Sequence, residues 1–196
     1  MAPVSAEPDR DKAFRAELTN LIPHLRAFAR TLCGEAAAAD DLAQDAMLKA
    51  WAARESFELG TNMKAWTFMI LRNQFYSERR RSWRQSQLDQ DAAERTLVAV
   101  DDPEAPIALD ELRQGLAMLP AEQREALILV GAGGFAYEEA AEICDCAVGT
   151  VKSRVSRARR ALHAILEGGA YDRDGEPAGD AMRSILADAE RLSTVR

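Results

Sequence analysis

Apolar residues recur at helical spacing along most of the chain, which predicts helices rather than strands. The first helical stretch runs from about Phe14 to Leu32 and ends at a Cys-Gly-Glu break, residues 33–35. A second is expected from about Ala39 to Trp51, with acids in its first turn, where the helix dipole favours them. A loop over residues 56–61 follows, and a third helix spans roughly Met63 to Arg84. Together these stretches, from residue 14 to residue 86, predict one compact domain of three to four helices.

The periodicity fades in the middle of the chain and then returns, which predicts a linker and a second domain. Residues 87–107 are acidic and include two prolines, so we expect an extended linker there. Helical spacing resumes in a second domain over residues 108–167, where Pro120 marks the start of a helix that runs to about Val130.

The two ends of the chain are expected to lie outside these domains. Residues 1–13 are polar and charged and are predicted to form an N-terminal tail. Residues 168–196 form a C-terminal tail with a short amphipathic segment after residue 180. The helical spacing of apolar residues in this amphipathic segment fits a loosely packed end and a partner-binding element equally well.

The strongest single pattern lies between Phe135 and Ile165. It predicts a helix over residues 137–143, a tight turn over 144–148 and a second helix over about 149–164, the arrangement of a helix-turn-helix. Apolar residues of the second helix recur at steps of three and four and fall on one stripe. The stripe consists of Val148, Val151, Val155, Ala158, Leu162 and Ile165.

The opposite face of this second helix carries the chemistry of a DNA reader. It holds Gly149, Ser153, Ser156, Arg157 and Arg160, with Thr150 and Lys152 at its flanks. Lys and Arg donate to guanine O6 and N7, and a glycine at the helix start lets the backbone approach a phosphate. A solvated cationic surface is the alternative. The preceding helix, the tight turn and the lack of any acid on this helix favour DNA.

Net charge is −7, from 25 Lys and Arg against 32 Asp and Glu, which at first argues against a nucleic-acid binder. The charge is unevenly distributed, however. Residues 35–58 contain six acids and two bases, whereas residues 64–84 contain six bases and one acid. Residues 152–160 contain five bases and no acid. The sequence therefore predicts two basic surfaces separated by acidic segments.

Composition fits an all-α protein of the cytoplasm. Hydrophobic residues make up 47%, and Gly and Pro are sparse, at 11 and 7 of 196 residues. No run approaches the roughly 18 apolar residues of a membrane span, and the N-terminus lacks a signal-peptide core. We therefore expect no membrane association.

The sequence offers little for catalysis, a cofactor or a metal. Cys33, Cys144 and Cys146 stand beside only two histidines, so packed thiols are favoured over metal ligands. The GAGG segment at 131–134 and the GTVKS segment at 149–153 do not match a phosphate loop. We predict that the chain is not an enzyme.

The helix-turn-helix segment, preceded by LPAEQREALIL at residues 119–129, resembles region 4 of the extracytoplasmic-function (ECF) sigma factors. That region reads the promoter −35 element. The resemblance implies base reading by Lys152, Ser153, Ser156 and Arg157, and phosphate contacts by Gly149, Thr150 and Arg160. Many relatives have Ser or Pro where Ala147 stands, so a side-chain helix cap is missing there.

The first domain is similar to region 2 of the same family. DDLAQDAMLKAWAARESF, residues 40–57, resembles the helix that docks on the clamp of the polymerase β′ subunit. The implied docking residues are Asp41, Gln44, Asp45, Leu48, Lys49 and Trp51. Acidic and apolar side chains suit a protein interface, whereas carboxylates would repel DNA.

MKAWTFMILRNQFYSERRR, residues 63–81, resembles the part of region 2 that melts and reads the −10 element. That task needs aromatic surface, amides and cations. The candidates are Asn62, Lys64, Arg72, Asn73, Tyr76, Arg79 and Arg80. The loop before this helix, residues 58–63, corresponds to the family loop that captures a flipped base. Trp66, Phe68 and Ile70 are assigned to the core.

The resemblance implies a two-domain, all-α ECF sigma factor that binds promoter DNA and core RNA polymerase, at the β′ clamp and the β flap. The free protein is expected to be a monomer. More narrowly, the chain looks like the EcfG subfamily of the general stress response, which implies control by a NepR-type anti-sigma factor.

Two alternatives remain. A sigma mimic would bind the anti-sigma factor without touching DNA, but such mimics usually carry a receiver domain, which the C-terminal tail is too short to contain. An ordinary helix-turn-helix repressor would leave residues 63–81 unexplained.

Overall fold

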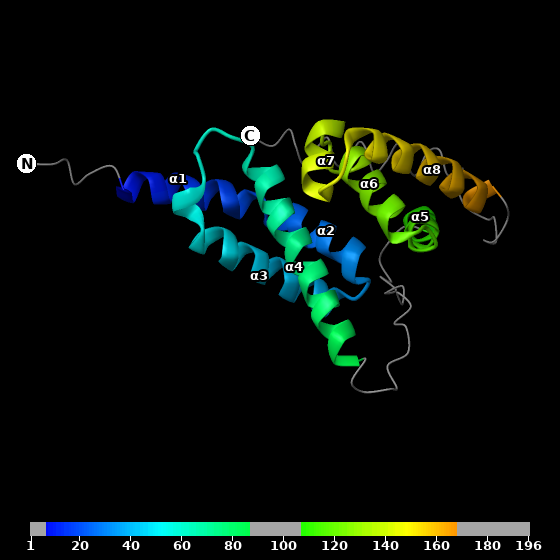
Figure 1. Cartoon of the computed structure of the whole chain (residues 1–196), viewed down its shortest axis with the longest axis horizontal. Coiled ribbons are helices and arrows are strands. Elements are labelled where there is room, and N and C mark those ends of the chain that lie inside the picture. Colours follow the sequence, from blue (N-terminus) through cyan, green and yellow to red (C-terminus); the bar gives the residue numbers. More distant parts are fainter. Residues whose placement is uncertain (1–6, 87–106, 168–196) are drawn as a thin grey trace, which may run out of the picture. The chain divides into compact units, whose positions relative to one another are not determined.

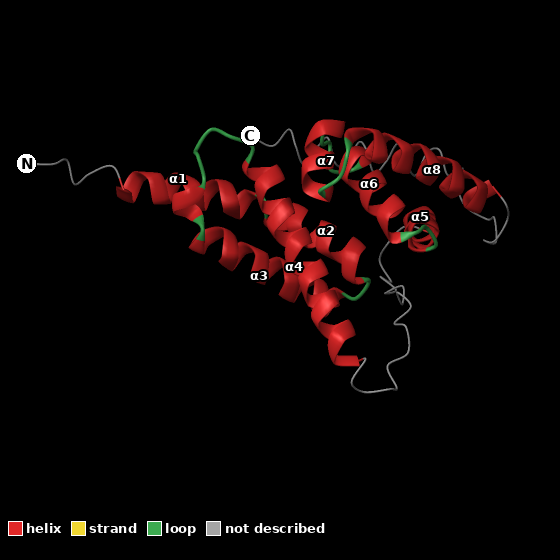
Figure 2. Ribbon diagram, viewed as in Figure 1, coloured by secondary structure: helices red, strands yellow, loops and turns green. Residues whose placement is uncertain are grey.

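A computed structural model describes residues 7–86 and 107–167, and regular structure within these ranges is helical throughout (Figure 2). The all-α fold class is therefore confirmed. The chain divides into two compact units, residues 1–95 and 96–196, whose helices are labelled in Figure 1. Residues 87–106 of the predicted linker and the amphipathic segment of the C-terminal tail lie outside the described residues. No described helix has the length and apolarity needed to span a bilayer.

The described part of the first unit consists of four α-helices and one 3-10 helix. They are α1 (Glu7–Asn20), α2 (Ile22–Cys33), α3 (Ala36–Ala52), η1 (Arg54–Ser56) and α4 (Met63–Ser86). Helix α3 packs against both α2 and α4. Leu25 and Leu71 are fully buried between these helices, and the rings of Phe28 and Phe68 stack with their centres 4.9 Å apart. Phe68 thus lies in the core as predicted. Trp66 and Ile70 are half-buried and pack against a second buried group around Phe14.

The helical stretch expected from Phe14 to Leu32 is divided between two helices, so the described part of the domain has four α-helices, the upper of the two numbers expected. The chain turns at Leu21, and α2 begins one residue before Pro23. Proline lacks an amide hydrogen and is tolerated in the first turn of a helix but not in its interior, which explains the break. The predicted N-terminal tail also ends earlier, since α1 begins at Glu7.

A second group of buried residues fastens α1 to the rest of the unit. It comprises Phe14, Leu18, Ala50, Phe57 and Met63. The ring of Phe14 meets those of Trp51, Phe57 and Trp66 at centre-to-centre distances of 6.0, 5.8 and 6.2 Å. Tilted and edge-on aromatic contacts of this kind are favourable. Helix α1 is therefore part of the folded unit rather than an appendage.

In its described part the second unit contains α5 (Ile107–Ala117), α6 (Ala121–Gly131), α7 (Tyr137–Cys144) and α8 (Val148–Glu167). Helix α8 packs against the other three. Its buried residues are Val151, Val155, Ala158 and Leu162, all of them members of the predicted apolar stripe. They face a core that includes the fully buried Leu129 and Ile143. Arg124 Nη1 of α6 donates to Ala117 O, 3.2 Å away at the end of α5.

The glycine-rich segment after α6 forms a tight turn. Gly133 N donates to Ile128 O at 2.7 Å, and Phe135 N donates to Leu129 O at 3.1 Å. A Cβ atom at Gly133 would lie 2.6 Å from Leu129 O and 2.9 Å from the Phe135 ring. The backbone and the buried Phe135 ring therefore leave room only for glycine, and the turn leads directly into α7.

Candidate nucleic-acid interface

The predicted DNA-reading residues of α8 lie on the side of the helix away from its buried stripe. Gly149, Thr150, Lys152, Ser156, Arg157 and Arg160 are exposed, and Ser153 is half-buried. Arg157 Nη2 donates to Ser153 Oγ one turn earlier, so these two side chains hold each other in place. Lys152 Nζ lies 5.6 Å from the centre of the Tyr137 ring of α7, a cation–π contact. The sequence assignments of α8 thus fall on one polar face.

The turn between α7 and α8 determines where this face begins. Asp145 has φ 50° and ψ 53°, a left-handed conformation that Asp and Asn tolerate better than most residues. Cys146 N donates to Ala141 O at 3.0 Å and closes the end of α7. At the start of α8, Thr150 N and Val151 N donate to Ala147 O at 2.8 and 3.2 Å. Because the amide of Thr150 is engaged in this way, its hydroxyl is the group that remains for a phosphate.

Arg154 is a residue of α8 that sequence reasoning missed. Its side chain is only 18% exposed, and Nη2 forms an ion pair with Glu122 Oε2 at the start of α6. Its Nη1 also lies 3.6 Å from Cys146 Sγ in the turn. Arg154 therefore ties α8 to α6 and to the turn. The signal available in the sequence was its position beside the apolar stripe rather than opposite it.

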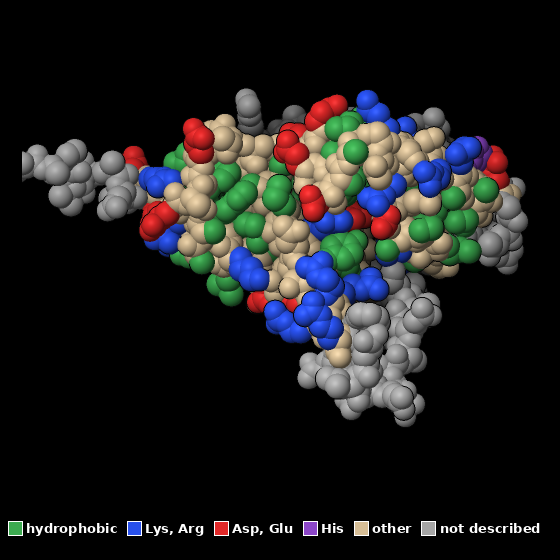
Figure 3. Space-filling model, in the orientation of Figure 1, with side chains coloured by type: hydrophobic (Ala, Val, Ile, Leu, Met, Phe, Trp, Pro, Cys, Tyr) green, Lys and Arg blue, Asp and Glu red, His purple; other side chains and the backbone are tan. Residues whose placement is uncertain are grey.

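The predicted −10 residues of α4 combine cations with aromatic rings. The Arg72 guanidinium lies 4.5 Å from the centre of the Tyr76 ring, and that of Arg79 lies 5.6 Å from the Phe75 ring. Asn73, Arg79 and Arg80 are exposed, whereas Lys64, Arg72 and Tyr76 are half-buried. Figure 3 shows Lys and Arg side chains gathered over the C-terminal part of α4. Such a combination suits single-stranded nucleic acid, whose bases stack on rings and whose phosphates attract cations.

Asn62 has a structural role that sequence reasoning did not foresee. Its Oδ1 accepts a hydrogen bond from Ala65 N at 2.9 Å, so the side chain caps the start of α4. The preceding loop is also held by its own bonds. Thr61 Oγ1 donates to Glu58 O at 2.7 Å, and Met63 N donates to Thr61 O at 3.0 Å. Leu59 at the tip of this loop is 39% exposed.

Most of the predicted polymerase-docking residues form one exposed face of α3. The face consists of Asp41, Gln44, Asp45, Leu48 and Lys49. Leu48 is 66% exposed, the highest value among the large apolar side chains that the structure describes. An exposed leucine bordered by carboxylates is typical of a protein interface rather than a DNA surface. Lys49 also donates to Gln74 Oε1 of α4, and Gln74 Nε2 donates to Glu78.

Trp51 lies apart from this docking face. Its ring packs against Phe14 in the core of the first unit. The guanidinium groups of Arg15 and Arg54 lie 5.1 and 4.9 Å from the ring centre. Half-buried and in contact with two cations, Trp51 fastens α1 to the end of α3. Its assignment to polymerase docking has no support in this geometry.

Three titratable groups of the first unit have pKa values that their surroundings shift. Burial, followed by the nearby charge of Lys64, lowers the pKa of His24. Burial, with Glu78 and Glu35 close by, raises the pKa of the Cys33 thiol to about 11, which keeps it protonated and unreactive. The hydrogen bond from Arg26 lowers the pKa of the Asp40 carboxyl. Among the residues described, no three His, Cys, Asp or Glu side chains gather closely enough to hold a metal ion.

Comparison with known proteins relates both units to one family. Sigma-70 region 2 matches residues 18–85, and Sigma-70 region 4 matches residues 109–162. The chain is 48% identical over 154 residues to the ECF RNA polymerase sigma factor EcfG of Rhodopseudomonas palustris, a match that covers 79% of this chain and 85% of the relative. It is 35% identical over 135 residues to the ECF RNA polymerase sigma-E factor of Escherichia coli, covering 62% of this chain and 70% of the relative.

A solved structure extends this similarity to three dimensions. It is the sigma factor RpoE of Bartonella quintana in complex with the anti-sigma factor NepR. The two chains are 48% identical with a TM-score of 0.71, and the match covers 80% of this chain and 98% of the other.

Proposed function

Because the chain belongs to the ECF family of RNA polymerase sigma factors, we propose that it binds core RNA polymerase and directs initiation at promoters with paired −35 and −10 elements. A sigma factor is a transcription factor and not an enzyme, so no residue is assigned to catalysis. Its place of action is the cytoplasm, where the polymerase and the chromosome lie.

The observation that carries this proposal is that each of the two units has a face of cationic and polar side chains suited to DNA. On α8, Arg157 is exposed and is held by Ser153. On α4, Arg72 and Tyr76 pair a cation with a ring. A sigma mimic needs neither face, and a simple repressor needs only the first. Both faces together support a factor that recognises two promoter elements.

On the −35 element, the polar face of α8 would lie in the major groove. Lys152 and Arg157 would donate to guanine edges, and Ser153 and Ser156 would donate to or accept from neighbouring bases. Gly149, Thr150 and Arg160 would contact phosphates at the edges of the groove, where contacts set position rather than sequence. The Lys152–Tyr137 contact limits the freedom of the lysine before DNA binds.

On the −10 element, α4 would replace the stacking that bases lose when the duplex opens. Tyr76 offers a ring face, and Arg72, Arg79 and Arg80 offer cations to the phosphates. Asn73 is exposed and presents an amide to a base edge. Lys64 and Asn62 lie at the start of the helix, beside the loop that receives an extruded base.

Core polymerase would dock on the exposed face of α3 through the β′ clamp. Leu48 supplies the apolar centre, and Asp41, Gln44, Asp45 and Lys49 surround it with polar groups, the usual layout of a protein interface. The second unit would contact the β flap.

Regulation by a NepR-type anti-sigma factor follows from the relatives. The RpoE structure that resembles this chain contains NepR, and the EcfG relative gives the subfamily. We therefore assign this chain to general stress-response genes. An inhibitor that covers the docking face would keep it from core polymerase, and one that covers the DNA-reading faces would keep it from promoters.

Run-off transcription with purified core polymerase tests the proposal. Polymerase plus this protein should produce transcripts from promoters that carry both elements, and scrambling either element should abolish them. A purified NepR-type protein added first should suppress the product. Polymerase binding without a transcript from any member of a genomic promoter library would instead favour the sigma mimic.

A further inference from the structure

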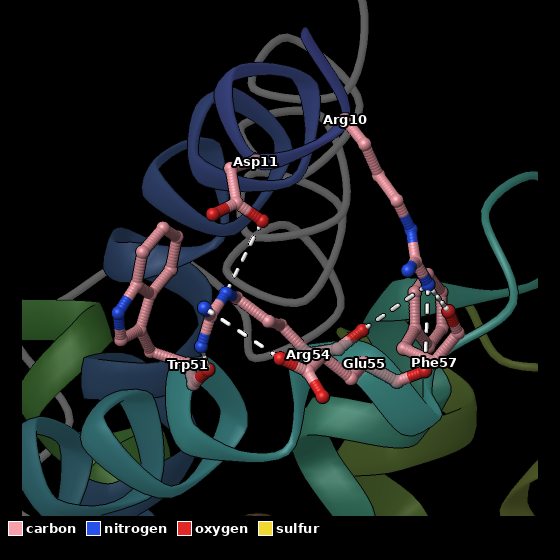
Figure 4. A network of polar contacts seen from close by, with 6 residues as sticks. All are labelled: Arg10, Asp11, Trp51, Arg54, Glu55 and Phe57. Carbon is pink, nitrogen blue, oxygen red and sulfur yellow. Dashed lines mark hydrogen bonds and ion pairs between the residues drawn. The ribbon is translucent and has the colours of Figure 1, made fainter. Parts of the chain in front are cut away.

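The first turns of α1 reach the 3-10 helix η1 through Arg10 (Figure 4). Arg10 Nη2 donates to Phe57 O at 2.9 Å and lies 3.5 Å from both Arg54 O and Glu55 O. The last carbonyls of a helical segment have no partner within it and carry partial negative charge. The guanidinium of Arg10 therefore caps the end of η1 from a distant part of the chain.

The neighbouring residue on α1 makes a second tie to the same turn. Arg54 Nε donates to Asp11 Oδ1 at 3.2 Å, and Arg54 Nη1 donates to Trp51 O at 3.3 Å. The Arg54 guanidinium also lies 4.9 Å from the centre of the Trp51 ring. In Figure 4 the Arg10 and Asp11 side chains both extend from α1 towards this turn. Two successive residues of α1 thus hold η1: Arg10 contacts its backbone carbonyls, and Asp11 binds the side chain of Arg54.

The exposed loop 58–62 starts where these contacts end. Phe57, whose carbonyl accepts from Arg10, is 4% exposed, and Met63 after the loop is 1% exposed. Both ends of the loop are therefore fixed in the core, while residues 58–62 between them are exposed. Gly60 has φ +92°, so the tip depends on a backbone conformation that glycine supplies. The backbone from which the loop leaves is held by two bonds at Phe57: its carbonyl accepts from Arg10, and its amide donates to Arg54 O at 3.3 Å.

We propose that Arg10 is a positioning residue for recognition of the −10 element: by holding the Phe57 carbonyl, it keeps loop 58–62 in the form that receives an extruded base. The proposal rests on the proposed function, in which this loop binds a −10 base. Arg10 touches no DNA in this scheme. It acts by removing the cost of ordering the loop when the base arrives, the general benefit of a binding site that is formed in advance.

The test compares full-length variants with core polymerase on two promoters. One promoter has an intact −10 element, and the other has an abasic nucleotide where the loop is expected to receive a base. On the intact promoter, Arg10→Ala should slow open-complex formation about tenfold, as expected for loss of a hydrogen bond from a charged group. Arg10→Lys should slow open-complex formation by less than Arg10→Ala does. Lys12→Ala removes the same charge from an exposed position of α1 and serves as the matched control.

The abasic promoter separates positioning from a general loss of fold. With no base to receive, the wild type and Arg10→Ala should open this promoter at the same rate. An equal loss on both promoters would show that Arg10 acts only through stability, which overturns the proposal. If the wild type itself opens both promoters equally, the loop binds no base, and the −10 assignment fails together with the role of Arg10. Should Arg10→Ala not fold, Arg10→Lys gives the same comparison.

Discussion

Gly133 lies where the chain leaves α6, with the backbone of Leu129 on one side and the Phe135 ring on the other. A methyl group there would approach Leu129 O to 2.6 Å, and a carbonyl oxygen cannot turn aside as a flexible side chain can. Gly133→Ala should therefore lower the free energy of unfolding of the second unit by about 1–3 kcal/mol. Urea unfolding followed by circular dichroism measures this loss.

Gly131 provides the matched control for that substitution. A Cβ at Gly131 meets nothing within 4 Å, and the residue ends α6. Gly131→Ala should leave stability unchanged or raise it by up to about 1 kcal/mol, because alanine restricts the unfolded chain. Equal losses in the two variants would contradict the steric account of Gly133.

Arg157 carries the sharpest prediction for promoter choice. If it donates to a guanine, Arg157→Ala should cost about 1–3 kcal/mol of −35 binding and relax selectivity at one base pair. Arg159→Ala removes the same charge from an exposed position outside the assigned set. Holoenzyme binding to a panel of single −35 substitutions measures both variants. A uniform loss across the panel would mark Arg157 as a phosphate contact instead.

Single residues were predictable where one helix determines their surroundings. Gly149, Ser156 and Arg157 lie on the face that the apolar stripe of α8 implies. The capping role of Asn62 could also have been predicted, since an asparagine just before the expected helix start at Met63 is a typical cap. For Arg154 the position beside the apolar stripe indicated partial burial, but its partner Glu122 could not be predicted, because it is 32 positions away in the sequence. Contacts between residues so far apart in the sequence depend on the tertiary fold, which the spacing of apolar residues within one helix does not determine.

At the scale of elements, α8 and α4 were predictable, whereas of α1 only the half from Phe14 onward was. Buried side chains recur along α8, whereas Phe14 and Leu18 are the buried apolar residues that the structure describes in α1. The first turns of α1 are held by Arg10 and Asp11, whose partners lie 43 to 47 positions further along the chain. In the sequence, a polar segment stabilised by such distant partners looks like a tail. The hydrophobic pattern that begins at Phe14 does not show that the helix starts earlier.

Arg154 and Arg160 lie on the same helix and should behave in opposite ways. Arg154→Ala breaks the tie between α8 and α6 and should cost roughly 1 kcal/mol of stability, from a partly exposed ion pair and lost packing. It should leave the salt dependence of promoter binding unchanged. Arg160→Ala should leave stability unchanged and reduce the slope of log affinity against log salt by about 1.

Urea unfolding and holoenzyme binding at several salt concentrations separate these two outcomes. A reduced salt slope for Arg154→Ala would show that this side chain reaches a phosphate. In that case its ion pair with Glu122 would have to open when DNA binds.

For the whole molecule, the distribution of charge is a better guide to DNA binding than the net charge. A net charge of −7 argues against DNA binding, yet acids and bases are sorted onto different elements. The exposed face of α3 carries Asp41 and Asp45, while α4 ends in a basic run and α8 carries exposed cations without acids before Glu167. The exposed face of α3 therefore has a negative electrostatic potential, and the basic surfaces of α4 and α8 have a positive one. The sequence revealed this sorting because each of the two basic runs lies within a single helix, residues 64–84 in α4 and residues 152–160 in α8.

Each unit also has its own buried core, which predicts that the two unfold as separate cooperative steps. The cores are represented by Leu25 and Leu71 in the first unit and by Leu129 and Val155 in the second. The chain contains a natural reporter for one of them. All three tryptophans, at positions 51, 66 and 83, lie in the first unit, so tryptophan fluorescence follows that unit alone, whereas circular dichroism follows both.

Gly133→Ala should therefore shift the circular dichroism transition to lower urea and leave the fluorescence transition in place. Leu25→Ala, at a fully buried site of the first unit, should lower the fluorescence midpoint by the equivalent of about 2–5 kcal/mol and shift only the part of the circular dichroism change that belongs to the first unit. A shift of the fluorescence transition by Gly133→Ala would show that the units unfold together. Independent transitions would mean that stability, like DNA reading, is divided between two domains that a single polymerase brings to one promoter.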